Sequence, residues 1–175
     1  VPGAWRGLDF RDTDAASAFH LSNAQIGWAD IAIDVFGDDI WLENCHLHHS
    51  ASKALDISSG DGSILACTFT ENQQHNVTQT LTDPPTIRDC HLENNNVENS
   101  SPYPYISIGL QGVNSPRIAG NTILGSGNHM SGGISVWNSS SAVIEDNTIS
   151  GCGYGILCYS VGANPTITGN TITDN

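Results

Sequence analysis

The chain has 175 residues, a length that suits a single domain. It carries 18 Asp and Glu residues against five Lys and Arg residues, which gives a formal net charge of −13. This balance argues against nucleic acid and anionic membrane surfaces as partners, because both would be repelled. The sequence contains no run of 18 apolar residues, so no membrane-spanning helix is predicted.

One phrase recurs along the chain, with a large apolar residue three positions before its centre and another two positions after it. In chain order the copies read FHLSNAQIGW, IWLENCHLHH, SILACTFTEN, TIRDCHLENN, PRIAGNTILG, AVIEDNTISG and NPTITGNTITDN. Their centres are Ala24, Cys45, Cys67, Cys90, Asn121, Asn147 and Asn170. A repeat of this length cannot bury its apolar side alone, so the copies are predicted to stack as coils of a solenoid with one continuous core.

Between the phrases lie short runs in which apolar and polar residues alternate. They are LDF at 8–10, IDV at 33–35, LDI at 55–57, ISI at 106–108, ISV at 134–136 and ILC at 156–158. Alternation with a period of two indicates strands with one buried face. No window shows a sustained helical period, so an all-β fold is predicted. The outward column of these strands is expected to contain Asp9, Asp34, Asp56, Thr78, Ser107, Ser135 and Leu157.

The central column of the phrase has its own physical interpretation. Asn tolerates the left-handed backbone conformation that a sharp turn between strands needs. Identical Asn side chains one coil apart can also form a hydrogen-bonded ladder. Cys45, Cys67 and Cys90 are expected to form a stack of buried, reduced thiols in the same column. A disulfide between Cys152 and Cys158 is the alternative use of cysteine in this chain.

The recurring GNTI and DNTI, followed by GGI or YGI, resemble the repeat of the right-handed parallel β-helix in the pectate-lyase-like superfamily. The opening VPGAWRGLDF resembles the first coil of surface and secreted β-helix proteins. The resemblance implies one β-helix solenoid of about seven coils over residues 1–175. Because the sequence starts and stops in mid-coil, we expect it to be a mature protein or part of a longer chain or assembly. The resemblance also implies an extracellular or cell-surface location, with the periplasm as the alternative. It does not imply an activity, because the repeat occurs in lyases, hydrolases, epimerases and adhesins.

Three aspartates stand out as a candidate site. Asp9, Asp34 and Asp56 are each the middle residue of an apolar–Asp–apolar triplet, so all three should point outward. Carboxylates one coil apart, at about 4.8 Å, repel by about 0.9 kcal/mol in water and about 3.5 kcal/mol at an effective dielectric constant of 20. The row could hold calcium, with Asp34 and Asp56 as ligands, or act on a glycoside as an acid and base pair. The alternative is a solvated face that discourages aggregation.

Aromatic residues suggest a second element of the site. Trp137 and Tyr159 are expected to be coil neighbours on the same sheet as the aspartates. An inserted loop, NNNVENSSPYPY, adds Tyr103 and Tyr105. Long loops on solenoids tend to lie on the binding face, and aromatic planes suit a sugar ring. The alternative is that these rings fill a loop or cap a corner.

His46 and His91 each follow the central cysteine of their phrase, and His48 lies two residues after His46. They are either solvent-exposed turn residues or ligands of copper or zinc.

Two classes of function remain. The first is an extracellular scaffold or adhesion module that needs no cofactor, binds polysaccharide, or assembles with copies of itself head to tail. The second is a polysaccharide lyase or glycoside hydrolase that uses the acidic row. Lyases of this superfamily use an Arg base beside calcium-binding carboxylates, but Arg88 and Arg117 lie away from the row in register. The hydrolases' Gly-His-Gly is absent near Asp38 and Asp39. The sequence therefore favours the scaffold.

Overall fold

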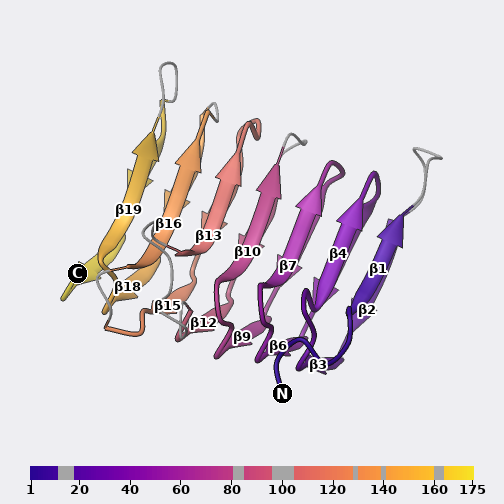
Figure 1. Ribbon diagram of the computed structural model, residues 1–175. Helices are drawn as coiled ribbons and strands as arrows, with labels where there is room; N and C mark the ends of the chain where they lie inside the picture. Colours follow the sequence, from indigo (N-terminus) through magenta and orange to yellow (C-terminus); the bar gives the residue numbers. More distant parts are fainter. Residues whose placement is uncertain (12–17, 81–84, 96–104, 128–129, 139–140, 160–163) are drawn as a thin grey trace.

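The computed structural model describes residues 1–11, 18–80, 85–95, 105–127, 130–138, 141–159 and 164–175. These residues wind into a parallel β-solenoid of seven coils, each made of three strands, and contain no helix (Figure 1). The predicted all-β solenoid is confirmed. In keeping with the sequence, the described part of the chain has no helix long and apolar enough to cross a membrane.

Strands at equivalent positions of successive coils pair in parallel and form three sheets. The first sheet contains β1 (Leu8–Arg11), β4 (Ile33–Phe36), β7 (Lys53–Ser58), β10 (His75–Thr80), β13 (Tyr105–Gln111), β16 (Ser131–Trp137) and β19 (Tyr154–Tyr159). The second sheet contains β2 (Ala18–Ser22), β5 (Asp39–Glu43), β8 (Gly62–Leu65), β11 (Thr86–Arg88), β14 (Arg117–Ala119), β17 (Val143–Glu145) and β20 (Thr166–Thr168). The third sheet contains β3 (Gln25–Gly27), β6 (His46–His48), β9 (Thr68–Thr70), β12 (His91–Glu93), β15 (Thr122–Leu124), β18 (Thr148–Ser150) and β21 (Thr171–Thr173).

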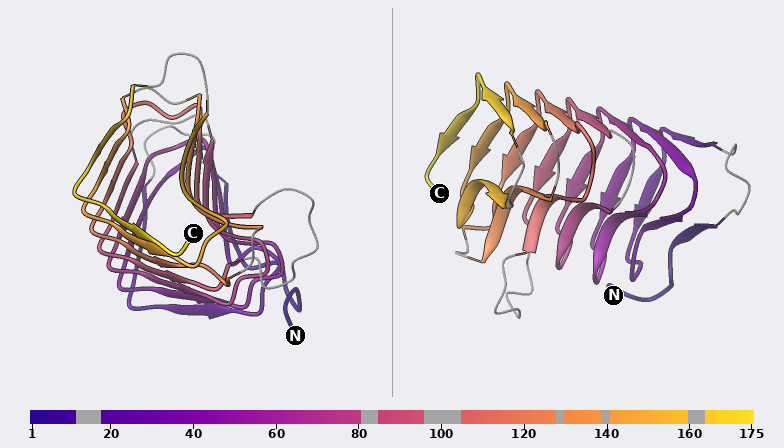
Figure 2. Two further views of the ribbon diagram at one scale, coloured as in Figure 1. Left: turned by 90° about the vertical axis from the view of Figure 1, so that its left-hand side faces the viewer. Right: turned by 90° about the horizontal axis from the view of Figure 1, so that it is seen from above.

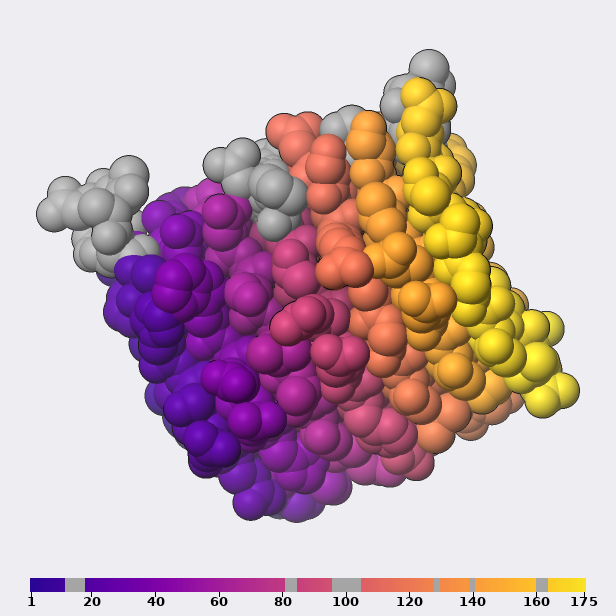
Figure 3. Space-filling model, turned by 180° about the vertical axis from the view of Figure 1, so that it is seen from behind, coloured from indigo at the N-terminus to yellow at the C-terminus, as the bar shows by residue number. Residues whose placement is uncertain are grey.

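Each coil packs directly on its neighbours in the sequence. Seen along the axis in Figure 2, the coils nearly superimpose. On the surface in Figure 3, the colours follow one another in bands from the first coil to the last. The three outward faces therefore carry straight columns of side chains, one from each coil. Such columns are what place residues from distant parts of the sequence side by side.

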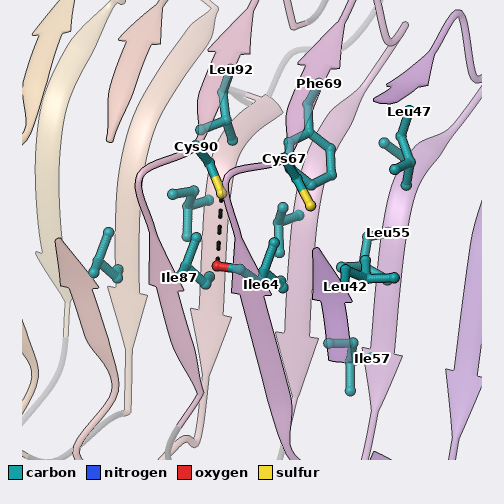
Figure 4. Close-up of a cluster of buried hydrophobic side chains, with 14 of the residues drawn as sticks. Leu42, Leu47, Leu55, Ile57, Ile64, Cys67, Phe69, Ile87, Cys90 and Leu92 are labelled. Carbon is teal, nitrogen blue, oxygen red and sulfur yellow. Dashed lines mark hydrogen bonds between the residues drawn. The ribbon is translucent and has the colours of Figure 1, made fainter. Parts of the chain in front are cut away.

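The core contains the two apolar columns that the repeat predicts, together with the inward side chains of the first sheet, such as Leu55 and Ile57. Strand register pairs every member with its neighbour, from Leu21 to Ile167 in the second sheet and from Ile26 to Ile172 in the third. Figure 4 shows the middle of this core, where Phe69 lies between Leu47 and Leu92. The expectation that all fourteen are buried is wrong at the ends. Ile167 and Ile172 are each 45% exposed, because the last coil has a neighbour on one side only, and Leu21 is half-buried.

The sharp turn between the second and third sheets is made one residue earlier than the sequence suggested. Positive φ falls on the residue before each centre: Asn23, Asn44, Ala66, Asp89, Gly120, Asp146 and Gly169. The centres themselves have ordinary φ, so the left-handed role predicted for the central Asn is wrong. The physical reason is that the central side chain points inward, where it is needed for hydrogen bonds.

The predicted ladder is present in the last three coils. The side-chain amide of Asn121 donates to Asn147 Oδ1 at 2.9 Å, and that of Asn147 donates to Asn170 Oδ1 at 2.9 Å. In the earlier coils Cys45, Cys67 and Cys90 form a stack of buried free thiols, two of which are drawn in Figure 4. Their thiols donate to main-chain oxygens, such as Cys67 to Leu65 at 3.3 Å.

All five cysteines of the chain are free thiols. The alternative disulfide between Cys152 and Cys158 is therefore not formed in this structure. Burial raises the pKa of Cys152 to about 11, which keeps this thiol protonated at neutral pH and suits a packing role.

Candidate functional site

The outward face of the first sheet carries the predicted row of aspartates. Asp9 pairs in register with Asp34, and Asp34 with Asp56, so the three carboxylates follow one another along the solenoid axis. Their side chains become less exposed along the row, from 46% for Asp9 to 27% for Asp34 and 14% for Asp56. The row is accessible at the Asp9 end and largely covered at the Asp56 end.

The protein's own cations compensate this row. Arg11 lies beside the first two carboxylates, with its Nε 2.5 Å from Asp9 and its terminal nitrogen 3.4 Å from Asp34. Lys53 Nζ lies 2.7 Å from Asp56, which also accepts a hydrogen bond from the Thr78 hydroxyl. The repulsion that made the row unusual in the sequence is thus partly relieved within the fold. The sequence did not indicate that Arg11 on β1 and Lys53 on β7 would form ion pairs with these carboxylates.

Asp34 remains the least favourably placed member. Its partial burial, followed by the negative charge of Asp56, raises the pKa of Asp34 above its ordinary value, and Arg11 offsets only part of this effect. A raised carboxyl pKa means that the folded state binds the proton more tightly than the unfolded state. This contribution to stability is present below the unfolded pKa and is lost as pH rises through the folded pKa.

We expect Asp34→Asn to raise the free energy of unfolding at neutral pH by up to about 1 kcal/mol, since partly exposed like charges repel weakly. Below the ordinary Asp pKa of about 3.9 the advantage should vanish, because Asp34 is then protonated. Melting curves of both proteins across pH measure this difference. Asp30→Asn, which changes an exposed acid outside the row, should leave stability within about 0.5 kcal/mol of the original.

The described residues contain no group of three or more His, Cys, Asp or Glu side chains arranged to hold a metal ion. The calcium hypothesis for Asp34 and Asp56 stays a prediction, and the same melting curves test it. If the hypothesis holds, calcium raises the melting temperature of the original protein but not of the Asp34→Asn variant. No calcium effect together with a neutral variant would leave the row as a solvated face.

The rest of the aspartate column differs from the sequence prediction at one coil. After Thr78 the column continues through Gly109, Ser135 and Leu157. The expected Ser107 lies two residues earlier on β13, where it is buried and donates to Asn95 Oδ1 at 3.0 Å. The prediction was wrong because apolar and polar residues alternate along β13. A shift of two residues in the pairing of β13 with β10 preserves this alternation, so the sequence does not distinguish Ser107 from Gly109.

A second outward column lies two residues further along each strand of the first sheet. Trp137 and Tyr159 are coil neighbours in it, as predicted, with ring centroids 5.5 Å apart and planes at 87°. Both rings are solvent-exposed, Trp137 by 46% and Tyr159 by 62%. The full column reads Arg11, Phe36, Ser58, Thr80, Gln111, Trp137 and Tyr159.

Phe36, which is 57% exposed, was not predicted as a site residue. The signal in the sequence is the apolar residue at an outward position directly after the triplet IDV.

A groove of about 200 Å³ lies between these columns, with Trp137 as its largest side chain. Gly109 leaves room at its floor, because this position has no side chain between Thr78 and Ser135. The outward polar side chains of the lining are those of Lys53, His75, Thr78, Thr80, Gln111 and Ser135. Hydroxyl and amide groups therefore face a tryptophan ring across a shallow space on the same face as the aspartate row.

The inserted tyrosines do not join this groove as a pair. Tyr105 begins β13 and packs edge-on against His75, with ring centroids 5.0 Å apart. It lies at the opposite end of β13 from Gln111, the residue in register with Trp137. Tyr103 falls outside the described residues. Tyr105 does not line the groove itself, although its neighbours His75 and Ile106 do.

Other candidate residues lie on other faces. His46 and His48 project from β6 on the third sheet with ring centroids 4.7 Å apart, and burial lowers the pKa of each. His91 is separated from His46 by Thr68 and lies 3.0 Å from Glu93. No group of three or more metal-binding side chains includes these histidines among the described residues, and the copper or zinc alternative stays a prediction.

The two arginines considered as lyase bases belong to the second sheet, on β11 and β14. Arg117 forms an ion pair with Glu145, and Arg88 lies 3.9 Å from Asp89. Neither residue is on the first sheet with the aspartate row, as the register predicted. Asp38, at the turn before β5, is buried.

A family model described as "right handed beta helix region" matches residues 16–175 of this chain. The chain belongs to this right-handed β-helix family. The match covers all seven copies of the repeated phrase, so the family and the solenoid seen in the structure agree. A search of the curated proteins found no match, and neither did a search of the solved structures. Right-handed β-helix membership establishes the fold, and the site on the first sheet has to be interpreted from its own chemistry.

Proposed function

We propose that the protein is a non-catalytic extracellular β-helix scaffold that binds a saccharide chain on the first sheet. The observation that carries the proposal is the exposed pair of Trp137 and Tyr159 beside the polar groove. An aromatic plane supplies the apolar contact for a sugar ring, and hydroxyl and amide groups orient it by hydrogen bonds. The columns run along the solenoid axis, which gives an extended chain repeated contacts from coil to coil.

The charges favour a neutral saccharide. Lys53 lines the groove, but its ammonium is already paired with Asp56, so the pair adds no net charge. The aspartate row lies on the same face, and the whole chain carries a net charge of −13. A uronate chain would be repelled at long range and would have to compete with Asp56 for Lys53.

Calorimetric titration of the protein with cellohexaose, maltohexaose and hexagalacturonate tests the proposal. At least one neutral hexasaccharide is expected to bind. Trp137→Ala and Tyr159→Ala should each weaken its binding about tenfold, or about 1.4 kcal/mol, as loss of a central aromatic contact does. Trp28→Ala, a matched change of an exposed tryptophan near the third sheet, should leave affinity unchanged. Absence of neutral-sugar binding, or tighter binding of hexagalacturonate, would contradict the proposal.

Glycoside hydrolysis is a second candidate function, favoured by the unlike environments of Asp34 and Asp56. The raised pKa of Asp34 suits a general acid, whereas Asp56 is held against a lysine ammonium. Two neighbouring carboxyl groups in unlike environments are the pattern of an acid and base pair. New reducing ends in the titrated mixtures, lost in the Asp34→Asn variant, would support hydrolysis and overturn the non-catalytic proposal.

A further inference from the structure

The second sheet carries a groove that is separate from the saccharide face. Its volume is about 310 Å³, larger than that of the groove beside Trp137. The side chains come from three successive strands, β2, β5 and β8, in the first three coils. Those that point outward are His20, Ser22, Trp41, Glu43, Ser63 and Leu65.

Trp41 is the dominant wall of this groove. It is 48% exposed, although the residues before and after it on β5 are buried in the core. On one side its coil neighbour is His20, whose ring lies at 89° to the indole with centroids 4.1 Å apart. On the other side the neighbour is the short Ser63, which leaves the indole uncovered. The two rings thus form an open right-angled corner.

The charge around this corner is negative. Asp39, Trp41 and Glu43 occupy alternate outward positions of β5, so a carboxylate lies on each side of the indole. Within the described residues, the Glu43 carboxylate makes no ion pair and no hydrogen bond. By contrast, the five described ion pairs that use Lys or Arg engage four cationic side chains, those of Arg11, Lys53, Arg88 and Arg117. None of these four side chains is therefore a cationic partner of the Glu43 carboxylate.

We propose that this groove binds an arginine side chain of a basic partner segment. A guanidinium stacked on the uncovered indole is attracted by the negative face of the ring, and its planar fork of donors can reach the Glu43 carboxylate. The net charge of −13 attracts such a segment at long range. The same charge disfavours a phosphate or carboxylate ligand. The site adds a protein-binding face to a scaffold whose first sheet is proposed to bind saccharide.

The indole N–H signals in a nitrogen–proton correlation spectrum test the proposal. The chain has four tryptophans, so each signal can be assigned with one Trp→Phe variant. Titration with hexa-arginine at physiological ionic strength is expected to shift the Trp41 signal in a saturable way. Glu43→Gln should weaken the affinity read from this signal about two- to fivefold, the range expected for one exposed cation contact. The matched variant Glu93→Gln, on the third sheet, should leave it unchanged.

Trp41→Leu keeps apolar bulk at the groove but removes the ring. Calorimetry should then show hexa-arginine binding weakened by a similar factor, with the melting temperature maintained. The proposal is overturned if the Trp41 signal does not move, if Glu43→Gln binds as well as the original, or if maltohexaose moves that signal more than hexa-arginine does. The Trp137 signal in the same spectra reports the saccharide face separately, so either proposal can fail without the other.

Discussion

Replacing Asn147 by Ala is expected to lower the free energy of unfolding by about 3–5 kcal/mol, because several buried polar groups lose their partners at once. Asn147 is 1% exposed. Its Oδ1 accepts hydrogen bonds from the main-chain and side-chain amides of Asn121 at 3.0 and 2.9 Å. Its Nδ2 donates to Ile118 O at 3.0 Å and to Asn170 Oδ1 at 2.9 Å. Denaturant unfolding followed by circular dichroism measures the change.

The same substitution at Asn170 is the matched comparison. Asn170 belongs to the same ladder, but it is half-buried in the last coil, where water can reach the groups left behind. Asn170→Ala should therefore cost less than half as much as Asn147→Ala. Equal losses of unfolding free energy at the two positions would mean that burial does not determine how much the ladder contributes to stability.

Phe69→Ala is expected to destabilise the fold by about 3–5 kcal/mol, through lost burial and the cavity left behind. Phe69 is fully buried at the middle of the third sheet's inward column, where it lies in register between Leu47 of the preceding coil and Leu92 of the next coil (Figure 4). Strands on both sides hold this part of the backbone, so the site has little freedom to collapse. Thermal and denaturant unfolding give the cost.

Phe36→Ala is the control for this change. It removes the same side chain from an outward position of the first sheet, where the ring is 57% exposed. Stability is expected to stay within about 0.5 kcal/mol. If the two alanine variants were equally unstable, the assignment of inward and outward columns would be wrong.

Most of the fold was predictable because the repeat is local. Each copy of the phrase places apolar residues at fixed distances from its centre, and a solenoid has no other way to bury them. The aspartate triplets and the pair Trp137 and Tyr159 were predictable for the same reason. Residues at equivalent positions of successive coils must become neighbours once the coils stack.

The errors arose where the local pattern is degenerate. The assignment of Ser107 to the outward column failed after the inserted loop, since a slip of two residues preserves the alternation of apolar and polar positions. The backbone conformation of the turn was assigned to the central Asn, whereas residues such as Asn23 and Gly120 adopt it. Both Asn and Gly suit such a conformation, and the sequence alone does not say which of two adjacent positions points inward.

The sequence by itself determined a stack of β coils, its two apolar columns, and which residues share a column, because these depend only on spacing along the chain. Only the tertiary structure decided which side chains of different columns and coils contact one another, and in what geometry. It brought Arg11 and Lys53 to the aspartate row, opened a groove over Gly109, and set His20 at right angles to Trp41. Such contacts depend on side-chain rotamers and on the widths of neighbouring strands and turns. No periodicity in the sequence records these quantities.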